Sequence, residues 1–426
     1  MSVTTFTHPA TGEICHFTVH KSGLPIYVWE KPKYGSSYAV FATQYGSVDT
    51  TFTVNGRSLT VPEGIAHYLE HKLFENEDCD AFAQYAKTGA SANAYTSFDR
   101  TAYLFSVTGD VTPSLEILLD FVQKPYFTPQ TVQKEQGIIG QEIRMCEDSP
   151  SRCVLFNMLQ GLYHNHPVRV DIAGTVESIA QITDTLLYDC YNAFYNLHNM
   201  VLAVAGNVTM EQVLTVCDRM LKDAPDWEMQ RPAPAEPVTA LKQRVEQAMP
   251  VSALMFCLGI KETMDGEYLS PDRLIGASMA LSLLASRGSP LYASLLQRGL
   301  INETFDVEYF DGRSFAMAMF SGESNDPDAV ADAIFDEIDR VRKEGFDQAD
   351  FDAGKRAMYG SQLRAFNQVE ACGDSLISDH FYGRNPFALA DAVAAVTKEQ
   401  VEQLLKDGFT RDRSCLSVIV PQTKEV

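Results

Sequence analysis

A proline-rich segment near the middle of the chain constrains its fold most strongly. Residues 224–237 read Ala-Pro-Asp-Trp-Glu-Met-Gln-Arg-Pro-Ala-Pro-Ala-Glu-Pro and contain four prolines. Proline lacks a backbone N–H and favours extended conformations, so this segment is typical of a linker. At 426 residues the chain is also too long for one ordinary core. We therefore expect two domains, residues 1–225 and 238–426, joined by a linker at 226–237.

A faint internal repeat indicates that the two halves are related. The strand pattern of Tyr103–Gly109 ends in a turn and precedes a helical pattern, and Phe315–Gly322 does the same in the second half. Tyr126-Phe127 and Gly345-Phe346 come next, and each precedes a long helical pattern. Three elements in the same order favour a duplication over chance.

Alternating apolar and polar residues predict several strands with helices between them. Consecutive strands joined by short turns indicate antiparallel pairing. The sequence therefore predicts an α+β fold of two homologous domains, each a mainly antiparallel sheet with helices packed on one face. The expected strands are Leu24–Glu30, Tyr38–Ser47, Ala92–Ser97, Thr101–Thr108, Met200–Ala205, Ala253–Ile260, Phe305–Phe310, Phe315–Ser321 and Ser414–Val420.

Composition excludes some partners and locations. The chain has 34 Lys and Arg against 56 Asp and Glu, a formal charge of −22. Nucleic acids and anionic membranes attract clustered basic residues, so neither is an expected partner. The first residues lack the basic start and apolar core of a secretory signal. The nine cysteines form no Cys-x-x-Cys pair, so we expect no disulfide framework and a cytoplasmic location.

One short segment carries the strongest chemical signal. Pro62 suits the first turn of a helix, and His67 and His71 stand four residues apart, on one face. Two imidazoles so placed can both bind one Zn²⁺. Glu70 lies beside them and could take a proton from water without being a ligand. This is His-x-x-Glu-His, the inverse of the common zinc-protease order. The alternative interpretation is an amphipathic helix with partly buried histidines.

A catalytic zinc needs a third protein ligand, and Glu142 is the candidate. Glu135 lies two helical turns before it and is assigned to orienting the site from outside the ligand set. Paired glutamates on a helix more often form a solvated face, which is the competing interpretation. Neighbouring isoleucines argue against it because they suggest a mostly buried helix; they are Ile138, Ile139 and Ile143.

The repeat provides an internal comparison for these ligands. An ungapped alignment of the two halves places Gly354 opposite Glu135 and Ser361 opposite Glu142. The second half also has no histidine in its matching early helix, around residues 272–286. One copy therefore carries a full ligand set, and the second domain is a degenerate copy without zinc ligands.

Several ordered motifs carry a resemblance to a known family. The chain resembles the pitrilysin/insulinase (M16) family of zinc metallopeptidases, which includes the mitochondrial processing peptidases. It is most similar to short, two-domain bacterial members. The second half matches more weakly. The matching stretches are Gly64–Glu75, Gly89–Tyr103, Glu135–Glu142, His166-Pro167 and Phe194–Asn207.

The resemblance implies a fold, a metal site and a substrate strand. It implies that His67, His71 and Glu142 bind one Zn²⁺ per chain and that Glu70 is the general base. It also implies an edge strand with which an extended peptide could pair through backbone hydrogen bonds. The residues of that strand are Ala92, Asn93, Ala94 and Tyr95.

The chain departs from the family pattern at one place. Active members draw an Arg, and a Tyr seven residues later, from the half without zinc, and these two residues contact the substrate carbonyl near the metal; the resemblance makes Arg298 the candidate substrate-binding Arg. Here Arg298 stands seven residues before Phe305, which has no hydroxyl, and by its Arg-Gly-Leu context Arg298 could match a neighbouring, non-catalytic position. The pair is incomplete under either alignment. We therefore expect a homodimer, or a heterodimer with a related subunit that supplies the pair.

These observations predict a zinc metalloendopeptidase that hydrolyses peptides or small unfolded polypeptides, completed by a partner subunit. The alternative is a non-catalytic subunit that binds peptides or stabilises a related peptidase. The missing Tyr favours this alternative, whereas the intact Glu70 opposes it because a structural metal site needs no general base. A zinc hydrolase that acts on a non-peptide amide is a third interpretation.

Overall fold

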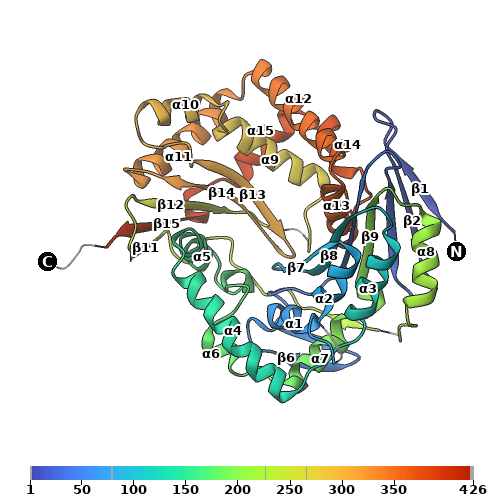
Figure 1. Cartoon of the computed structure of the whole chain (residues 1–426). Helices are drawn as coiled ribbons and strands as arrows, with labels where there is room; N and C mark the ends of the chain where they lie inside the picture. Colours follow the sequence, from blue (N-terminus) through green and yellow to red (C-terminus); the bar gives the residue numbers. More distant parts are fainter. Residues whose placement is uncertain (1, 78–79, 226, 265, 423–426) are drawn as a thin grey trace. The chain divides into compact units, whose positions relative to one another are not determined.

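The computed structural model describes residues 2–77, 80–225, 227–264 and 266–422. Some residues of the predictions lie outside the described residues. They are Cys79, position 226 of the expected linker, residue 1 of the first expected domain, and residues 265 and 423–426 of the second. Contacts divide the described chain into two compact units (Figure 1). Unit 1 comprises residues 1–143, 171–232 and 363–387, and unit 2 comprises residues 144–170, 233–362 and 388–426.

Unit 1 is built on a seven-stranded sheet in the described residues, with the order β1-β2-β3-β9-β4-β8-β7. Neighbouring strands are antiparallel except β3 and β9, which are parallel. The strands are β1 (Thr4–Thr7), β2 (Ile14–Val19), β3 (Pro25–Glu30), β4 (Ser36–Thr43), β7 (Ser91–Thr96), β8 (Thr101–Thr108) and β9 (Met200–Gly206). A smaller sheet has the order β10-β5-β6, from Met229–Gln230, Thr51–Val54 and Arg57–Thr60.

Helices cover the face of this sheet that carries the large apolar core. Side chains alternate along a strand, so Ala39 and Phe41 of β4 face this core together with Leu202 and Val204 of β9. The helices of this part of the chain are α1 (Ile65–Leu73), α2 (Ala81–Thr88), α3 (Thr112–Val122), α4 (Pro129–Glu147), α6 (Val176–Ile179), α7 (Asp184–Phe194) and α8 (Met210–Met220).

Unit 2 repeats the plan with a five-stranded sheet in the part that is described, ordered β11-β15-β12-β14-β13. Only the β11–β15 pairing is parallel among these strands. The strands are β11 (Arg244–Met249), β12 (Met255–Lys261), β13 (Asp306–Gly312), β14 (Phe315–Glu323) and β15 (Ser414–Pro421). The helices are α5 (Pro150–Leu162), α9 (Pro271–Ala285), α10 (Pro290–Gln297), α11 (Pro327–Glu344), α12 (Gln348–Ala365), α14 (Ala388–Ala395) and α15 (Lys398–Asp407).

The second face of each sheet is covered by a helix from the other half of the sequence. Helix α13 (Val369–Phe381) packs on β4 and β9, and α5 packs on β12 and β15 (Figure 1). Both contacts are close: a Cβ on Gly373 of α13 would lie 2.5 Å from the Tyr38 ring, and one on Gly259 of β12 would lie 2.2 Å from Met158 Sδ. Glycine at these two positions lets helix and sheet backbones approach.

The predicted α+β class with two related, mainly antiparallel sheets is confirmed. All nine expected strands are present, with ends shifted by a few residues. The prediction placed helices on one face only. Each sheet also has a helix on its other face that comes from the other half of the sequence, and we call α5 and α13 the exchanged helices. The compact units therefore differ from the predicted domains by residues 144–170 and 363–387. No helix among the described residues is both long enough and apolar enough to cross a membrane.

One carboxylate holds the end of the expected linker. Glu236 accepts hydrogen bonds from the backbone amides of His164, Asn165 and His166 at 2.8, 2.8 and 2.9 Å, and Lys261 Nζ donates to it at 2.9 Å. Burial alone would raise the pKa of Glu236, but the backbone and Lys261 donors outweigh burial and the pKa is lowered.

We expect Glu236→Gln to lower the free energy of unfolding by about 2 kcal/mol near neutral pH, because its amide N–H₂ would face donors. The folded pKa lies below the unfolded value of about 4.3, so the carboxylate stabilises the fold above that pH and loses this effect as the pH falls through the folded pKa. The melting temperatures of the wild type and of Glu236→Gln should therefore differ near neutral pH and become equal in acid. Glu246→Gln is the control, because that side chain is 52% exposed. If Glu236→Gln were destabilised by the same amount near neutral pH and in acid, the prediction would be contradicted.

Candidate metal centre

The helix that carries His-x-x-Glu-His begins at a sterically restricted glycine. Gly64 precedes α1 with φ = 85°, and a Cβ there would lie 2.3 Å from the carbonyl oxygen of Ala173. Only glycine adopts this conformation readily in so little space. The helix therefore starts at Ile65, and the expectation that Pro62 lies in its first turn is wrong. Pro62 instead lies in the loop that leads to Gly64.

Three predicted ligand groups from two helices converge. His67 and His71 of α1 lie with ring centroids 4.6 Å apart. Glu142 of α4 reaches both: its Oε1 is 3.5 Å from His67 Nε2, and its Oε2 is 3.6 Å from His71 Nε2. One ligand atom from each residue lies within 4.8 Å of the others. In the described part of the chain this is the single group of three such side chains that could hold a metal ion.

Glu135 forms a hydrogen bond with the ring nitrogen of His71 that faces away from Glu142. His71 Nδ1 and Glu135 Oε1 are 3.1 Å apart, and this hydrogen bond lowers the pKa of Glu135. With Nδ1–H donating to Glu135, His71 presents the lone pair of Nε2 toward Glu142. A carboxylate behind a histidine is the usual arrangement at protein zinc sites because it fixes the tautomer and the ring orientation. The structure thus brings Glu135 to the site.

The charges around the cluster suit a cation. Burial alone would lower the pKa of His71, but the hydrogen bond with Glu135 and the carboxylates of Glu70 and Glu142 outweigh burial and raise it. The negative charge that favours a protonated imidazole would equally favour a bound metal ion. Two imidazole nitrogens and one carboxylate oxygen form a donor set typical of catalytic zinc, which leaves a fourth position open. The residues present therefore fit Zn²⁺.

Helix α4 is less buried than its isoleucines suggested. Ile139 and Ile143 face the core, but Ile138 is 48% exposed. The reason is helical geometry: positions 139 and 143 are four apart on one face, whereas 138 shares the outer face with Glu142. The expectation of a mostly buried helix is wrong, and Glu142 lies at a partly exposed position beside a buried stripe.

Glu70 lies next to the cluster and has its own partner. Thr96 Oγ1, at the end of β7, donates a hydrogen bond of 2.7 Å to Glu70 Oε2. Burial raises the pKa of Glu70, although the hydrogen bond from Thr96 acts in the opposite direction. A carboxylate with a raised pKa, close to a metal-binding group, is suited to accept and return a proton. Sequence reasoning singled out Glu70 but missed Thr96.

The predicted substrate strand lies at the end of its sheet. Strand β7 contains Ala92, Asn93, Ala94 and Tyr95 and pairs with β8 alone among the described strands. It also packs against α1, the helix of the two histidines. An edge strand presents unpaired backbone groups with which an extended peptide can form hydrogen bonds.

Arg298 lies in the other unit. It follows the last turn of α10 and is exposed, whereas Phe305 is buried. Arg298 belongs to unit 2, whereas His67 and His71 belong to unit 1. Gly354 and Ser361, opposite Glu135 and Glu142 in the repeat, both lie on α12, as that alignment requires.

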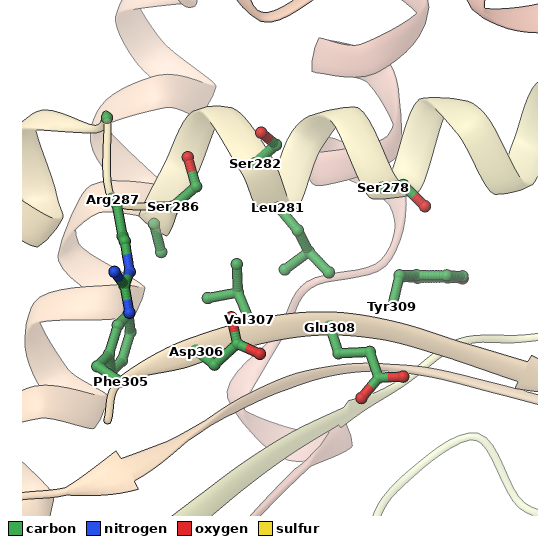
Figure 2. A pocket seen from close by; sticks show the side chains of 12 residues that line it. Ser278, Leu281, Ser282, Ser286, Arg287, Phe305, Asp306, Val307, Glu308 and Tyr309 are labelled. Carbon is green, nitrogen blue, oxygen red and sulfur yellow. The ribbon is translucent and has the colours of Figure 1, made fainter. Parts of the chain in front are cut away.

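Unit 2 also contains a pocket of about 510 Å³ between α9 and β13. Figure 2 shows Leu281 of α9 and Val307 of β13 pointing toward one another across it. Its lining includes Asp306 and Glu308 but no histidine or cysteine. The pocket thus lacks the nitrogen or sulfur ligands of a zinc site. Sequence reasoning did not single it out.

Two family models match consecutive parts of the chain. Residues 60–176 match the model described as Insulinase (Peptidase family M16). Residues 181–358 match the model described as Peptidase M16 inactive domain. The first match contains all three converging ligands as well as Glu70 and Glu135.

Individual proteins extend this similarity over nearly the full length. An uncharacterized zinc protease, YmfH of Bacillus subtilis (strain 168), is 37% identical over 413 residues, which cover 94% of this chain and 95% of that protein. The crystal structure of a putative M16-like peptidase from Alicyclobacillus acidocaldarius superposes with a TM-score of 0.93 at 32% identity, covering 98% and 100% of the two chains. The beta subunit of the Neurospora crassa mitochondrial-processing peptidase is 28% identical over 51% of this chain and 45% of its own.

Proposed function

The chain belongs to the insulinase family, peptidase family M16, and from this premise we propose that it is a zinc endopeptidase that hydrolyses peptides or small unfolded polypeptides. The observation that carries the proposal is the convergence of His67, His71 and Glu142 within 4.8 Å, with Glu70 beside them. The names of the relatives support a zinc protease in general. The endopeptidase activity is our inference from the site.

Each residue of the site has a role in the proposed reaction. His67, His71 and Glu142 would hold one Zn²⁺, and Glu135 keeps the ring of His71 in the orientation for binding. When bound, the ion would supply Lewis acidity for the scissile carbonyl and lower the pKa of an attacking water. Glu70 takes the proton from that water and passes it to the amine nitrogen as the C–N bond breaks.

The edge of unit 1 supports a peptide as the substrate. An extended chain that pairs with Ala92–Tyr95 of β7 would gain backbone hydrogen bonds that do not depend on its sequence. Because β7 packs against α1, a peptide paired with β7 would lie next to the helix that carries the two histidines. This arrangement favours peptides over other amides.

We also propose that a related subunit completes the active site. Arg298 and Phe305 do not form the Arg and Tyr pair expected from active family members, since Phe305 has no hydroxyl and is buried. One relative is named as a subunit of the mitochondrial-processing peptidase, and this name supports a paired arrangement. The partner would be a second copy of this chain or a paralogue.

A non-catalytic, peptide-binding subunit is the second candidate. The incomplete pair and the description of the second family model as an inactive domain favour it. The general-base geometry of Glu70 opposes it, because a carboxylate held beside the metal ligands by Thr96 has no use in a purely structural site.

The test is mass-spectrometric mapping of a peptide mixture incubated with the zinc-loaded chain, alone and with a paralogous subunit. We expect internal cleavages that disappear with a chelator and return when Zn²⁺ is added. Cleavage should be at least about tenfold faster with the partner, because removing one group that stabilises the developing oxyanion commonly costs more than that. Peptide binding without cleavage under every condition would favour the second candidate.

A further inference from the structure

The hydroxyl of Thr96 has one proton and one well-placed acceptor. Its Oγ1 lies 2.7 Å from Glu70 Oε2 and 3.4 Å from Thr101 Oγ1, its cross-strand neighbour. Thr101 donates its own proton to the carbonyl of Tyr45 at 2.9 Å, so it can only accept from Thr96. A carboxylate oxygen at the shorter distance is the better acceptor. The proton of Thr96 is therefore directed at Glu70.

The turn after Thr96 is held rigidly. Arg100 is buried and donates to Asp99 Oδ1 at 3.0 Å, to Ser378 Oγ at 2.6 Å and to the Tyr382 hydroxyl at 2.6 Å. Tyr382 in turn donates to Asp99 Oδ2 at 3.0 Å. Ser378 lies on α13 and Tyr382 caps it, so the exchanged helix fixes this turn.

The loop at residues 46–48 packs closely against the same turn. A Cβ on Gly46 would lie 2.4 Å from the backbone of Phe98 and Asp99. Amides of the same loop, at Ser47 and Val48, donate to the carbonyls of Ser97 and Phe98 at 3.1 and 3.0 Å. The end of β7, and Thr96 with it, is thus fixed from both sides, and its hydroxyl is a preorganised donor.

The corresponding hairpin of unit 2 closes without a threonine pair. In unit 2 the closing pair of β13 and β14 is Gly312 opposite Phe315, which has no hydroxyl. That copy also has no counterpart of the His-x-x-Glu-His segment in α9. A threonine pair thus closes the hairpin in the unit that carries Glu70 and does not close the hairpin in the other unit.

Resting on the proposed function, we propose that Thr96 is a positioning residue for Glu70: its hydroxyl holds the carboxylate in the one orientation from which Glu70 takes and returns the proton during peptide hydrolysis. With Oε2 of Glu70 held by Thr96, Oε1 is the oxygen proposed to take the proton. Thr96 does not touch the reacting atoms and acts only through Glu70.

The test compares zinc-loaded Thr96→Val, which keeps the shape and loses the hydroxyl, with Thr96→Ser, which keeps the hydroxyl. Thr108→Val on the exposed end of β8 is the matched control. We expect Thr96→Val to lower kcat about tenfold with KM within about twofold, as for the loss of one hydrogen bond to a charged group. Thr96→Ser should stay within about threefold of the wild type, and zinc content should be unchanged. An unchanged kcat in Thr96→Val, or equal losses in both variants, would overturn the proposal.

A second readout separates this proposal from the proposed function. Crystal structures of the zinc-loaded proteins should show one Glu70 rotamer in the wild type and in Thr96→Ser, and a displaced or divided carboxylate in Thr96→Val. An ordered, unmoved Glu70 in Thr96→Val would overturn the positioning role even if no peptide is cleaved. Absence of cleavage by the wild type with every partner would instead count against the endopeptidase.

Discussion

Glu70→Gln is expected to retain zinc and to lose peptide hydrolysis by a factor of about 10² to 10⁴, the usual contribution of a general base. The amide has nearly the same shape, and its oxygen can still accept the hydrogen bond from Thr96, so the fold and the ligands should not change. It cannot take a proton from water. The measurement is kcat with a peptide substrate, together with zinc per chain by elemental analysis.

The control for this variant is Glu147→Gln, at the exposed end of α4, which removes one carboxylate without touching the cluster. Its activity and zinc content should equal those of the wild type. Retained hydrolysis in Glu70→Gln would remove the general-base assignment while leaving the metal site standing.

His67→Ala is expected to weaken zinc binding by more than about 100-fold, since even supporting residues outside the ligand set contribute 10- to 100-fold. It leaves His71 and Glu142 alone to hold the ion, and two ligands do not make a catalytic site. Hydrolysis should fall below detection for lack of metal. The measurement is competition for zinc against a chelator of known affinity.

His164→Ala is the matched control for metal loss. His164 is a histidine whose Nε2 lies 3.1 Å from the carbonyl oxygen of Thr239, and it is outside the converging group. Its zinc content should be normal. If His67→Ala and His164→Ala bound zinc equally well, the three-ligand centre would be wrong.

The local part of the site could be predicted because it depends on helical spacing alone. His67, Glu70 and His71 lie within two turns, so their shared face follows from 3.6 residues per turn. Glu142 is far away in sequence, and it was chosen by helical pattern and family resemblance. Ile138 shows the weakness of such patterns, because an apolar residue beside buried ones can lie on the outer face.

Other features have no local signal. Thr96 is one threonine among many, and its role depends on the pairing of β7 with β8 and on the packing of α1 against them. The exchange of α5 and α13 could not be read from hydrophobic patterns either. An apolar stripe on a helix indicates that the helix packs against an apolar surface, but it does not indicate which sheet provides that surface. The start of α1 was misplaced for a similar reason, because the fit of Gly64 against Ala173 is a tertiary contact.

The exchanged helix α13 has a consequence for biosynthesis. The proposed zinc ligands all lie within the first 142 residues, yet the helix that packs on the second face of the unit 1 sheet and contacts Arg100 begins at Val369. A nascent chain would therefore carry the proposed metal ligands on an unfinished scaffold until α13 has left the ribosome. A fragment that ends before α13 would contain every proposed ligand and lack the helix contacts that hold Arg100 and the turn after Thr96.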